Sequence, residues 1–335
     1  MLPAAIDEWV VDPTLALDAI VGRERPLVVR GLCRDWPVVR SALVSDTAFA
    51  EDLAARDSGV EVDVLLMPPG EGGLVGYNAA GDGFNYVHHR VSITQALQRL
   101  AQYSRQAAEP AGLAVQSALI SACLPGFHAD HPLRLLDPAV PPRLWIGNRV
   151  TTPAHFDEFH NIACVVCGRR RFTLFAPEQV RNLYVGPLDF APTGAAISMA
   201  RLDRPDDPRF PRLKLALAQA QMAELSPGDA IYIPPLWWHH VESLGQLNAL
   251  VNYWWKPRPL QGYAPDTALG CLLHCILAFK SLPAAERAAW KGLLDYYVFG
   301  DEDPAAHIPV ARRGILGALT PEQLAGVLET IRRYL

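Results

Sequence analysis

The stretch Pro227-Gly-Asp-Ala-Ile-Tyr-Ile-Pro-Pro-Leu-Trp-Trp-His-His-Val-Glu-Ser243 contains two short apolar runs with proline and glycine around them. The first run, Ala230–Ile233, follows Pro227-Gly228, and the second, His239–Leu244, follows Pro234-Pro235. β-Branched and aromatic residues favour strands, whereas proline and glycine favour turns. The stretch therefore predicts two short strands, as in an all-β sandwich or barrel.

Runs of the same kind occupy much of the chain between residues 143 and 255, with turn residues such as Gly168 and Gly245 between them. Many short strands separated by turns predict a mostly β fold, namely a double-stranded β-helix of the cupin or jelly-roll type. Residues 181–210 are rich in proline and aspartate, so we expect an excursion between the two halves of the barrel. The predicted strands are Leu144–Gly147, Asn161–Cys167, Arg170–Phe175, Ala230–Ile233, His239–Leu244 and Leu247–Trp255.

Helical patterns flank the predicted barrel on both sides. Before it, Ser92 is a candidate N-cap for a helix that extends to about residue 108. After it, we predict helices over 267–279, 284–299 and 321–334. We therefore expect a double-stranded β-helix domain over residues 1–260 and a C-terminal helical segment over residues 261–335. Two of the C-terminal helices have apolar faces, so we expect a homodimer; the alternative is that these helices pack on the barrel.

Charge and hydropathy exclude several classes of protein. The chain has 335 residues, a net charge of −5 and a pI of about 6.1, so it lacks the basic surplus of a nucleic-acid-binding protein. Its N-terminus does not resemble a signal peptide. No apolar run approaches the roughly 18 residues of a membrane span. We expect a cytoplasmic protein that binds neither nucleic acid nor membrane.

A metal site is predicted by His155, Asp157 and the later pair His239-His240. Side chains two residues apart on a strand point to the same side, so His155 and Asp157 can bind one ion. A histidine from a distant strand would complete the set. Two histidines and one carboxylate on one face of a metal, with the other positions open, form the facial triad of non-haem Fe(II) oxygenases.

Only one of the adjacent residues His239 and His240 can face that ion, because neighbouring side chains of a strand point to opposite faces. Val241 shares the face of His239, and the charged Glu242 shares the face of His240. We expect the charged face to be exposed to solvent. The predicted metal ligands are therefore His155, Asp157 and His239.

Three segments resemble the JmjC-type cupin-like oxygenases. Within that family, they are most similar to the asparaginyl hydroxylases that act on hypoxia-inducible factor. They are Thr152-Pro-Ala-His-Phe-Asp-Glu158, Gly168-Arg-Arg-Arg-Phe-Thr-Leu-Phe175 and the stretch that begins at Pro227. The resemblance covers roughly residues 143–256. It implies a double-stranded β-helix, a C-terminal helical dimer, and dependence on Fe(II), 2-oxoglutarate and O2. Its metal ligands correspond to the same three residues that strand alternation selects.

The resemblance also implies a 2-oxoglutarate pocket. The family has a lysine for the far carboxylate of 2-oxoglutarate at the position of Arg170, where a guanidinium can bind a carboxylate through two hydrogen bonds. Thr152 corresponds to a hydroxyl donor, and Asn161 and Asn252 correspond to amides near the co-substrate. One departure is Ala114, which stands where the family commonly has a tyrosine.

Further residues are implied around the metal and at the mouth of the site. Trp254 corresponds to a tryptophan beside the iron, although it could equally be a core aromatic residue. Tyr77 and Gln116 correspond to residues that line the substrate entrance. Tyr77 lies in a glycine-rich loop, where site residues often occur.

The sequence therefore predicts an Fe(II)- and 2-oxoglutarate-dependent hydroxylase that oxidises a C–H bond, with the metal triad as its only catalytic residues. The resemblance implies a protein side chain as substrate, and a small molecule remains open. Residues 193–198 lack the Arg-Gln pair of the asparaginyl hydroxylases, so asparagine is not carried over. Two alternatives remain: a metal-binding cupin enzyme that does not use 2-oxoglutarate, and a non-catalytic cupin binding module.

Overall fold

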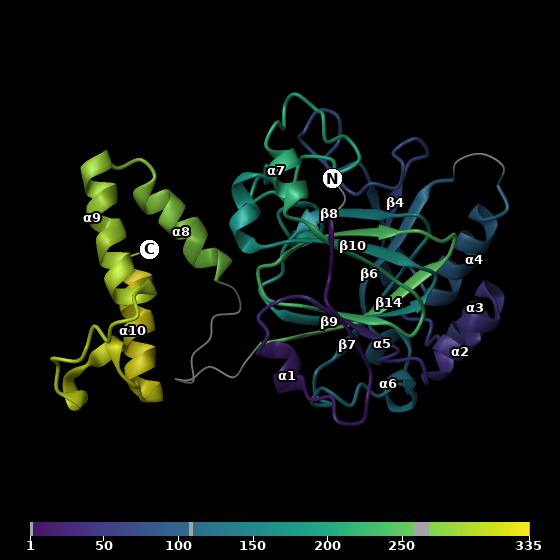
Figure 1. The fold of residues 1–335 in the computed structure, drawn as a ribbon, viewed down its shortest axis with the longest axis horizontal. Helices are drawn as coiled ribbons and strands as arrows, with labels where there is room; N and C mark the ends of the chain where they lie inside the picture. The colour runs from purple at the N-terminus through teal and green to yellow at the C-terminus, as the bar shows by residue number, and fades with distance from the viewer. Residues whose placement is uncertain (1–2, 107–109, 257–267, 335) are drawn as a thin grey trace. The chain divides into compact units, whose positions relative to one another are not determined.

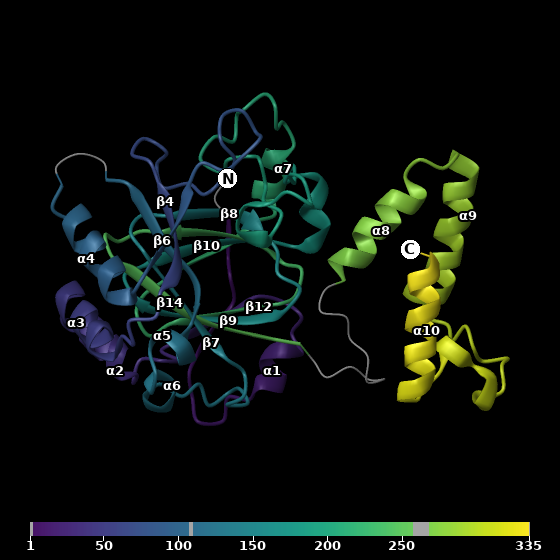
Figure 2. The same ribbon diagram turned by 180° about the vertical axis from the view of Figure 1, so that it is seen from behind.

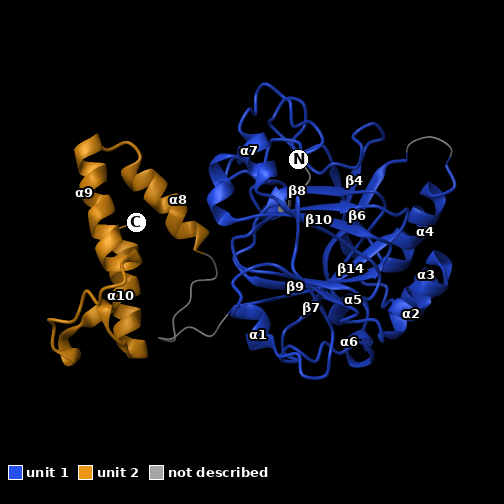
Figure 3. Cartoon of the chain, viewed as in Figure 1, with its two compact units in different colours: residues 1–256 blue, residues 257–335 orange. Residues whose placement is uncertain are grey.

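The chain forms two compact units, Met1–Lys256 and Pro257–Leu335 (Figure 3). The computed structural model describes residues 3–106, 110–256 and 268–334. Strands dominate the first unit and helices the second (Figure 1). The predicted mostly β class, with flanking helices and a C-terminal helical segment, is confirmed.

Two sheets make up the barrel of the first unit. The larger sheet has the strand order β2-β3-β12-β9-β14-β7-β6-β4-β5, and the smaller has the order β1-β11-β10-β13-β8. The strands of the larger sheet are β2 (Glu8–Val10), β3 (Leu27–Arg30), β4 (Val62–Met67), β5 (Val87–Val91), β6 (Gly112–Leu119), β7 (Pro142–Gly147), β9 (His160–Cys167), β12 (Ala230–Ile233) and β14 (Asn248–Trp255). Those of the smaller sheet are β1 (Ala4–Ala5), β8 (Thr151–His155), β10 (Arg170–Phe175), β11 (Gln221–Leu225) and β13 (Trp238–Ser243).

Alternation along β9 shows how the two sheets enclose a core. Ala163 and Val165 belong to the apolar cluster between the sheets, whereas Ile162, Cys164 and Val166 pack on the opposite face of the larger sheet. Both faces of β9 are therefore buried, which explains why its sequence is continuously apolar rather than alternating. The cluster between the sheets also contains Val28, Phe172, Leu174, Leu225, Ile231, Ile233, Val241 and Leu250.

Helices cover the outer face of the larger sheet, as both Figure 1 and Figure 2 show for α2, α3 and α4. The predicted helix begins after Ser92 as expected but ends at Tyr103 rather than at about residue 108. Ser92 and Gln95 form a reciprocal capping box, with each side chain bonding the other residue's backbone N–H. The helices of the first unit are α1 (Leu17–Val21), α2 (Pro37–Val44), α3 (Asp46–Arg56), α4 (Ile93–Tyr103), α5 (Ile120–Cys123), α6 (Phe127–Asp130) and α7 (Leu213–Ala218).

The segment between β10 and β11 covers the outer face of the smaller sheet. It contains the predicted excursion and ends in α7, whose Leu213 and Ala216 pack in one cluster with Ala154 of β8 and Trp238 of β13. Both sheets are therefore covered on their outer faces as well as buried between them.

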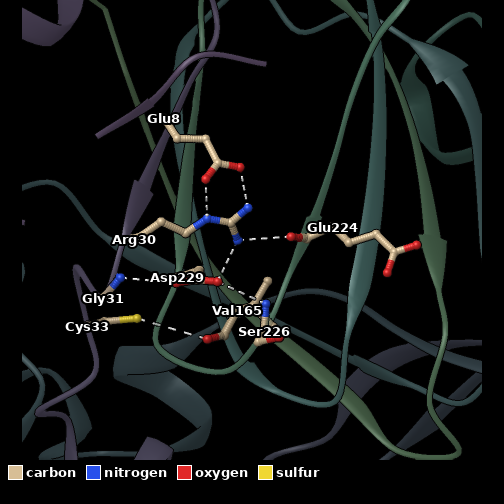
Figure 4. A network of polar contacts seen from close by, with 8 residues as sticks. All are labelled: Glu8, Arg30, Gly31, Cys33, Val165, Glu224, Ser226 and Asp229. Carbon is tan, nitrogen blue, oxygen red and sulfur yellow. Dashed lines mark hydrogen bonds and ion pairs between the residues drawn. The ribbon is translucent and has the colours of Figure 1, made fainter. Parts of the chain in front are cut away.

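A polar network joins the N-terminal strands to the turn between β11 and β12 (Figure 4). Arg30 of β3 bonds to both oxygens of Glu8 on β2, and its Nη1 donates to Asp229 Oδ2 at 2.7 Å. Asp229 also accepts from the backbone N–H groups of Gly31 and Ser226, at 3.0 and 3.2 Å. The Asp229 carboxylate of the opening motif therefore joins β3 to the turn before β12.

The second unit contains α8 (Leu269–Phe279), α9 (Ala284–Leu294), which continues into a π-helical turn (Asp295–Phe299), and α10 (Pro321–Tyr334). These elements correspond to the three predicted C-terminal helices. None of their described residues is buried. In the part of the chain that the structure describes, no helix is long and apolar enough to cross a membrane.

Candidate metal centre

His155, Asp157 and His239 come together between the two sheets. His155 of β8 and His239 of β13 are directly paired across the antiparallel strands, and their ring centroids are 4.1 Å apart. Asp157 follows two residues after His155, and its Oδ2 lies 3.6 Å from His239 Nε2. One possible ligand atom from each residue lies within 4.8 Å of the others. The structure therefore brings together the three predicted ligands.

Backbone carbonyls orient both imidazoles. Nδ1 of His155 lies 2.9 Å from the carbonyl oxygen of Pro153, and Nδ1 of His239 lies 3.0 Å from that of Trp237. Because a carbonyl can only accept, Nδ1 is the donor in each contact, which leaves Nε2 as the nitrogen that can bind a metal. This is the arrangement that metal-binding histidines adopt when an outer partner fixes the tautomer.

Burial acts on His239, and a hydrogen bond orients Asp157, in ways that suit metal binding. Burial, together with the neighbouring His155, lowers the pKa of His239 to about 4, so its imidazole is neutral at neutral pH. Trp254 Nε1 donates to Asp157 Oδ2 at 3.1 Å and so fixes the direction of the carboxylate. Two imidazoles and one oriented carboxylate form a donor set suited to Fe(II).

The neighbouring His240 shows that one premise of the sequence argument was wrong. His240 faces away from the triad and pairs with Thr173 of β10, as alternation predicts. However, it is buried rather than exposed to solvent, since it is only 6 % exposed. Burial lowers its pKa to about 4. The excursion covers this face of the smaller sheet, and a local pattern could not reveal that cover.

A cavity of about 110 Å³ opens beside the triad. All the residues predicted to bind the metal, the co-substrate or the substrate line this cavity, except Tyr77. The residues that line it are Gln116, Trp145, Thr152, His155, Asp157, Asn161, Ala163, Arg170, Phe172, Ala195, Ile233, His239, Val241, Leu250, Asn252 and Trp254.

Arg170 is the most unusual of these residues. Its side chain points inward, on the same side of β10 as Phe172, and the residue is 9 % exposed. Its Nε is buried without a hydrogen-bond partner among the described residues, and no carboxylate of those residues forms an ion pair with it. Burial lowers the pKa of Arg170 to about 10, so the guanidinium remains charged at neutral pH. An unpaired buried cation is costly, which favours an anionic ligand in this cavity.

The turn that precedes β10 decides which arginine faces inward. Gly168 has a φ of +69°, and a Cβ there would lie 2.4 Å from the carbonyl oxygen of Leu247. This glycine allows the tight connection from β9 to β10. Arg169 and Arg171 are consequently directed outward, and both pair with Glu224.

A chain of amide hydrogen bonds crosses the cavity wall, and the sequence analysis identified only part of it. Asn252 Nδ2 donates to Asn161 Oδ1 at 3.2 Å, and Asn252 Oδ1 accepts from Trp145 Nε1 at 2.8 Å. Trp145 was not among the predicted site residues. Its alternation with Leu144 and Ile146 placed it on the same face as the cavity, and that signal could have identified it.

Two predicted positions lie elsewhere. The Tyr77 hydroxyl donates to the carbonyl oxygen of Phe190 at 2.8 Å, and its ring packs against Phe84 and Phe190, so it does not line the cavity. Ala114 packs with Leu65, Tyr86 and other buried residues outside the cavity lining. Position 114 therefore provides no hydroxyl group where the resembling family commonly has a tyrosine.

Comparison with known proteins identifies the class. A family model described as a cupin-like domain matches residues 13–261, and the chain belongs to this family. The chain is 36% identical over 119 residues to Jumonji C domain-containing protein 5 of Drosophila melanogaster. The aligned region covers 35% of this chain and 28% of that protein.

Two further relatives have similar sequence identity to this chain. Lysine-specific demethylase JMJ31 of Arabidopsis thaliana is 36% identical over 33% of this chain and 20% of its own length. HSPB1-associated protein 1 of Homo sapiens is 32% identical over 43% of this chain and 30% of its own length. The matches thus span less than a third of each of these relatives. They confirm the predicted resemblance to JmjC-type cupin-like proteins.

Proposed function

We propose that this protein is an oxygenase of the cupin type that uses Fe(II), 2-oxoglutarate and O2 to hydroxylate a C–H bond. The observation that carries the proposal is the unpaired guanidinium of Arg170 in the same cavity as the triad. A metal site alone suits many cupins, whereas a buried cation beside it suits a co-substrate with a second carboxylate.

Each residue of the cavity has a role in this proposal. His155, Asp157 and His239 would hold Fe(II), and Trp254 would fix the carboxylate of Asp157 through its indole N–H. Arg170 would bind the far carboxylate of 2-oxoglutarate. The bound iron would supply the oxidising power for hydroxylation, with O2 as the oxidant and 2-oxoglutarate as the co-substrate that is converted to succinate and CO2.

The polar residues of the wall would orient the co-substrate. Thr152 offers a hydroxyl group, and the bonded amides of Asn161 and Asn252 offer fixed donors and acceptors. The apolar residues Ala163, Ile233 and Leu250 line the cavity and limit the entry of water.

A protein side chain is the substrate that we propose, with a small molecule as the alternative. One relative is named as a lysine-specific demethylase and another as a protein associated with HSPB1, which supports an amino-acid side chain as the substrate. Gln116 lies in the cavity wall, where it would meet the substrate.

Anaerobic titration of the Fe(II)-loaded protein with 2-oxoglutarate tests this proposal. We expect the weak visible absorption band of the iron chelate to appear in the wild-type protein and to be absent in Asp157→Ala, which loses a metal ligand. Arg170→Gln should bind iron but require a much higher concentration of 2-oxoglutarate. The proposal fails if the wild-type protein binds Fe(II) yet shows no band at millimolar 2-oxoglutarate.

The second candidate is a metal-binding cupin enzyme that does not use 2-oxoglutarate. It is favoured by Ala114, which stands where the resembling family commonly has a tyrosine that donates to the far carboxylate. Bound iron without a chelate band would favour this candidate. A non-catalytic binding module would bind neither iron nor 2-oxoglutarate.

A further inference from the structure

A second arginine, Arg143, lies on the cavity face of the larger sheet. It stands two residues before Trp145 on β7 and pairs directly with Asn252 of β14. Residues two apart on a strand, and residues paired across strands, have side chains on the same face. Both neighbours line the metal cavity, so the side chain of Arg143 extends from the same face at the end of β7.

Aromatic contact brings this guanidinium close to the reactive centre. Its central carbon is 6.0 Å from the centroid of the Trp254 ring. Trp254 in turn donates a hydrogen bond to Asp157, the predicted carboxylate ligand. One indole therefore lies between the cation and the metal site, which places Arg143 beside the cavity rather than inside it.

An irregularity in β6 holds the guanidinium in place. The register between β6 and β7 shifts between Val115 and Ala118, and Ser117 has a φ of +47°. As a result, Gln116 lines the cavity while the carbonyl oxygen and hydroxyl of Ser117 accept from Arg143 Nη1 at 3.1 and 3.3 Å. Such bulges redirect side chains near functional sites.

The charge of Arg143 is not compensated within the described part of the chain. Many arginines there, including Arg30, Arg56 and Arg171, pair with carboxylates. Arg143 is half-buried and forms no ion pair with any described residue, although the whole chain has a net charge of −5. Its Nη1 is fixed by neutral oxygens, and its other N–H groups remain available for a carboxylate.

We infer that Arg143 is a specificity-determining residue that binds an acidic side chain of a peptide substrate next to the residue that is oxidised. This inference rests on the proposed oxygenase function and adds a substrate class to it. Aspartate and glutamate share the carboxylate chemistry that a fixed guanidinium recognises. The contact of Arg143 with Trp254 links substrate recognition to the wall of the metal site.

Selection from a random peptide display library tests the inference. The full-length protein is loaded with Mn(II) and 2-oxoglutarate, so that no turnover consumes the peptides. We expect the wild-type protein to enrich peptides that contain Asp or Glu, Arg143→Gln to lose this enrichment, and Arg143→Glu to favour Lys and Arg. For one selected acidic peptide, Arg143→Gln should lower the affinity about tenfold.

Two controls separate this inference from the proposed function. Arg40→Gln removes a charge from an exposed position on α2 and should select the same peptides as the wild type. The Fe(II) and 2-oxoglutarate titration is repeated on Arg143→Gln, which should keep the chelate band. A missing band in the wild type would refute the oxygenase proposal alone. Failure to enrich acidic peptides, or equal enrichment by wild type and Arg143→Gln, would refute the role of Arg143.

Discussion

At the scale of single residues, the burial of Arg170 lowers the stability of the fold but favours the binding of an anion. Arg170 is buried with an unpaired Nε, and an uncompensated buried charge commonly costs several kcal/mol. An apolar side chain of similar length would remove that cost. The residue is therefore poorly explained by stability and well explained by an anionic ligand.

Replacement of Arg170 tests this trade-off. We expect Arg170→Met to unfold at the same temperature as the wild type or higher when 2-oxoglutarate is absent, because a buried charge is removed. The wild type should gain about 2.7 kcal/mol at a 2-oxoglutarate concentration a hundred times its Kd, and the variant should gain nothing. Thermal unfolding with and without 2-oxoglutarate measures both effects. Arg169→Met, which changes an outward-facing neighbour, should retain the gain; a ligand-dependent gain in Arg170→Met would contradict the prediction.

Trp254 provides a second test at this scale. Trp254→Phe keeps an aromatic ring and removes the N–H group that bonds to Asp157. Loss of an outer partner of a metal ligand typically lowers metal affinity about ten- to a hundredfold. Calorimetric titration with Fe(II) under anaerobic conditions measures this change. Trp255→Phe is the matched control, because Trp255 stacks on His160 and not at the triad; equal iron affinity in both variants would show that the indole N–H has no such role.

At the scale of elements, the turn between β11 and β12 connects the N-terminus of the chain to the barrel. Asp229 accepts hydrogen bonds from Arg30, Gly31 and Ser226 (Figure 4). These donors come from the last residue of β3, from the residue after it and from the turn itself. A single carboxylate therefore maintains the antiparallel pairing of β12 with β3 at its end.

We expect Asp229→Ala to destabilise the first unit by about 1–3 kcal/mol, because its partly buried donors lose their acceptor. Urea unfolding followed by circular dichroism measures the difference. Glu224→Gln is the control: its pairs with Arg169 and Arg171 lie at the surface, and such pairs contribute about 0–1 kcal/mol. Similar destabilisation by both substitutions would mean that the turn network has no special structural role.

At the scale of the whole molecule, the two units differ in how they bury apolar side chains. The first unit has clusters between and outside its sheets, whereas the described helices of the second unit have no buried residue. Leu277 is 80 % exposed and Phe299 is 74 % exposed. Apolar side chains exposed in this way are common in protein–protein interfaces when they form a contiguous patch.

A homodimer through the C-terminal helices remains our prediction. We expect the wild-type protein to sediment as a dimer, and Leu277→Glu on α8 to shift it toward the monomer because a charge disfavours an apolar interface. Sedimentation velocity over a range of protein concentrations measures the shift. Val44→Glu, at a similarly exposed apolar position on α2, should remain dimeric. A wild-type monomer at all concentrations would refute the prediction.

The sequence by itself determined the β class, the main strands and the three residues that meet at the candidate metal centre. These features depend on short-range rules: strand residues alternate between two faces, and proline and glycine end strands. Alternation allowed only one of His239 and His240 on the triad side, the charge of Glu242 favoured His239, and the resemblance added Arg170, Asn161 and Asn252. His239 and these last three residues line the cavity in the structure.

Only the tertiary structure decided which surfaces are closed and which residues from distant strands meet. The excursion buries His240, and contact with Phe190 keeps Tyr77 away from the cavity. Trp145 joins the amide chain because β7 lies beside β14, about a hundred residues later in the sequence. Arg143 approaches Trp254 for the same reason. A local pattern fixes the direction of a side chain along its own strand, but long-range packing decides what that side chain faces.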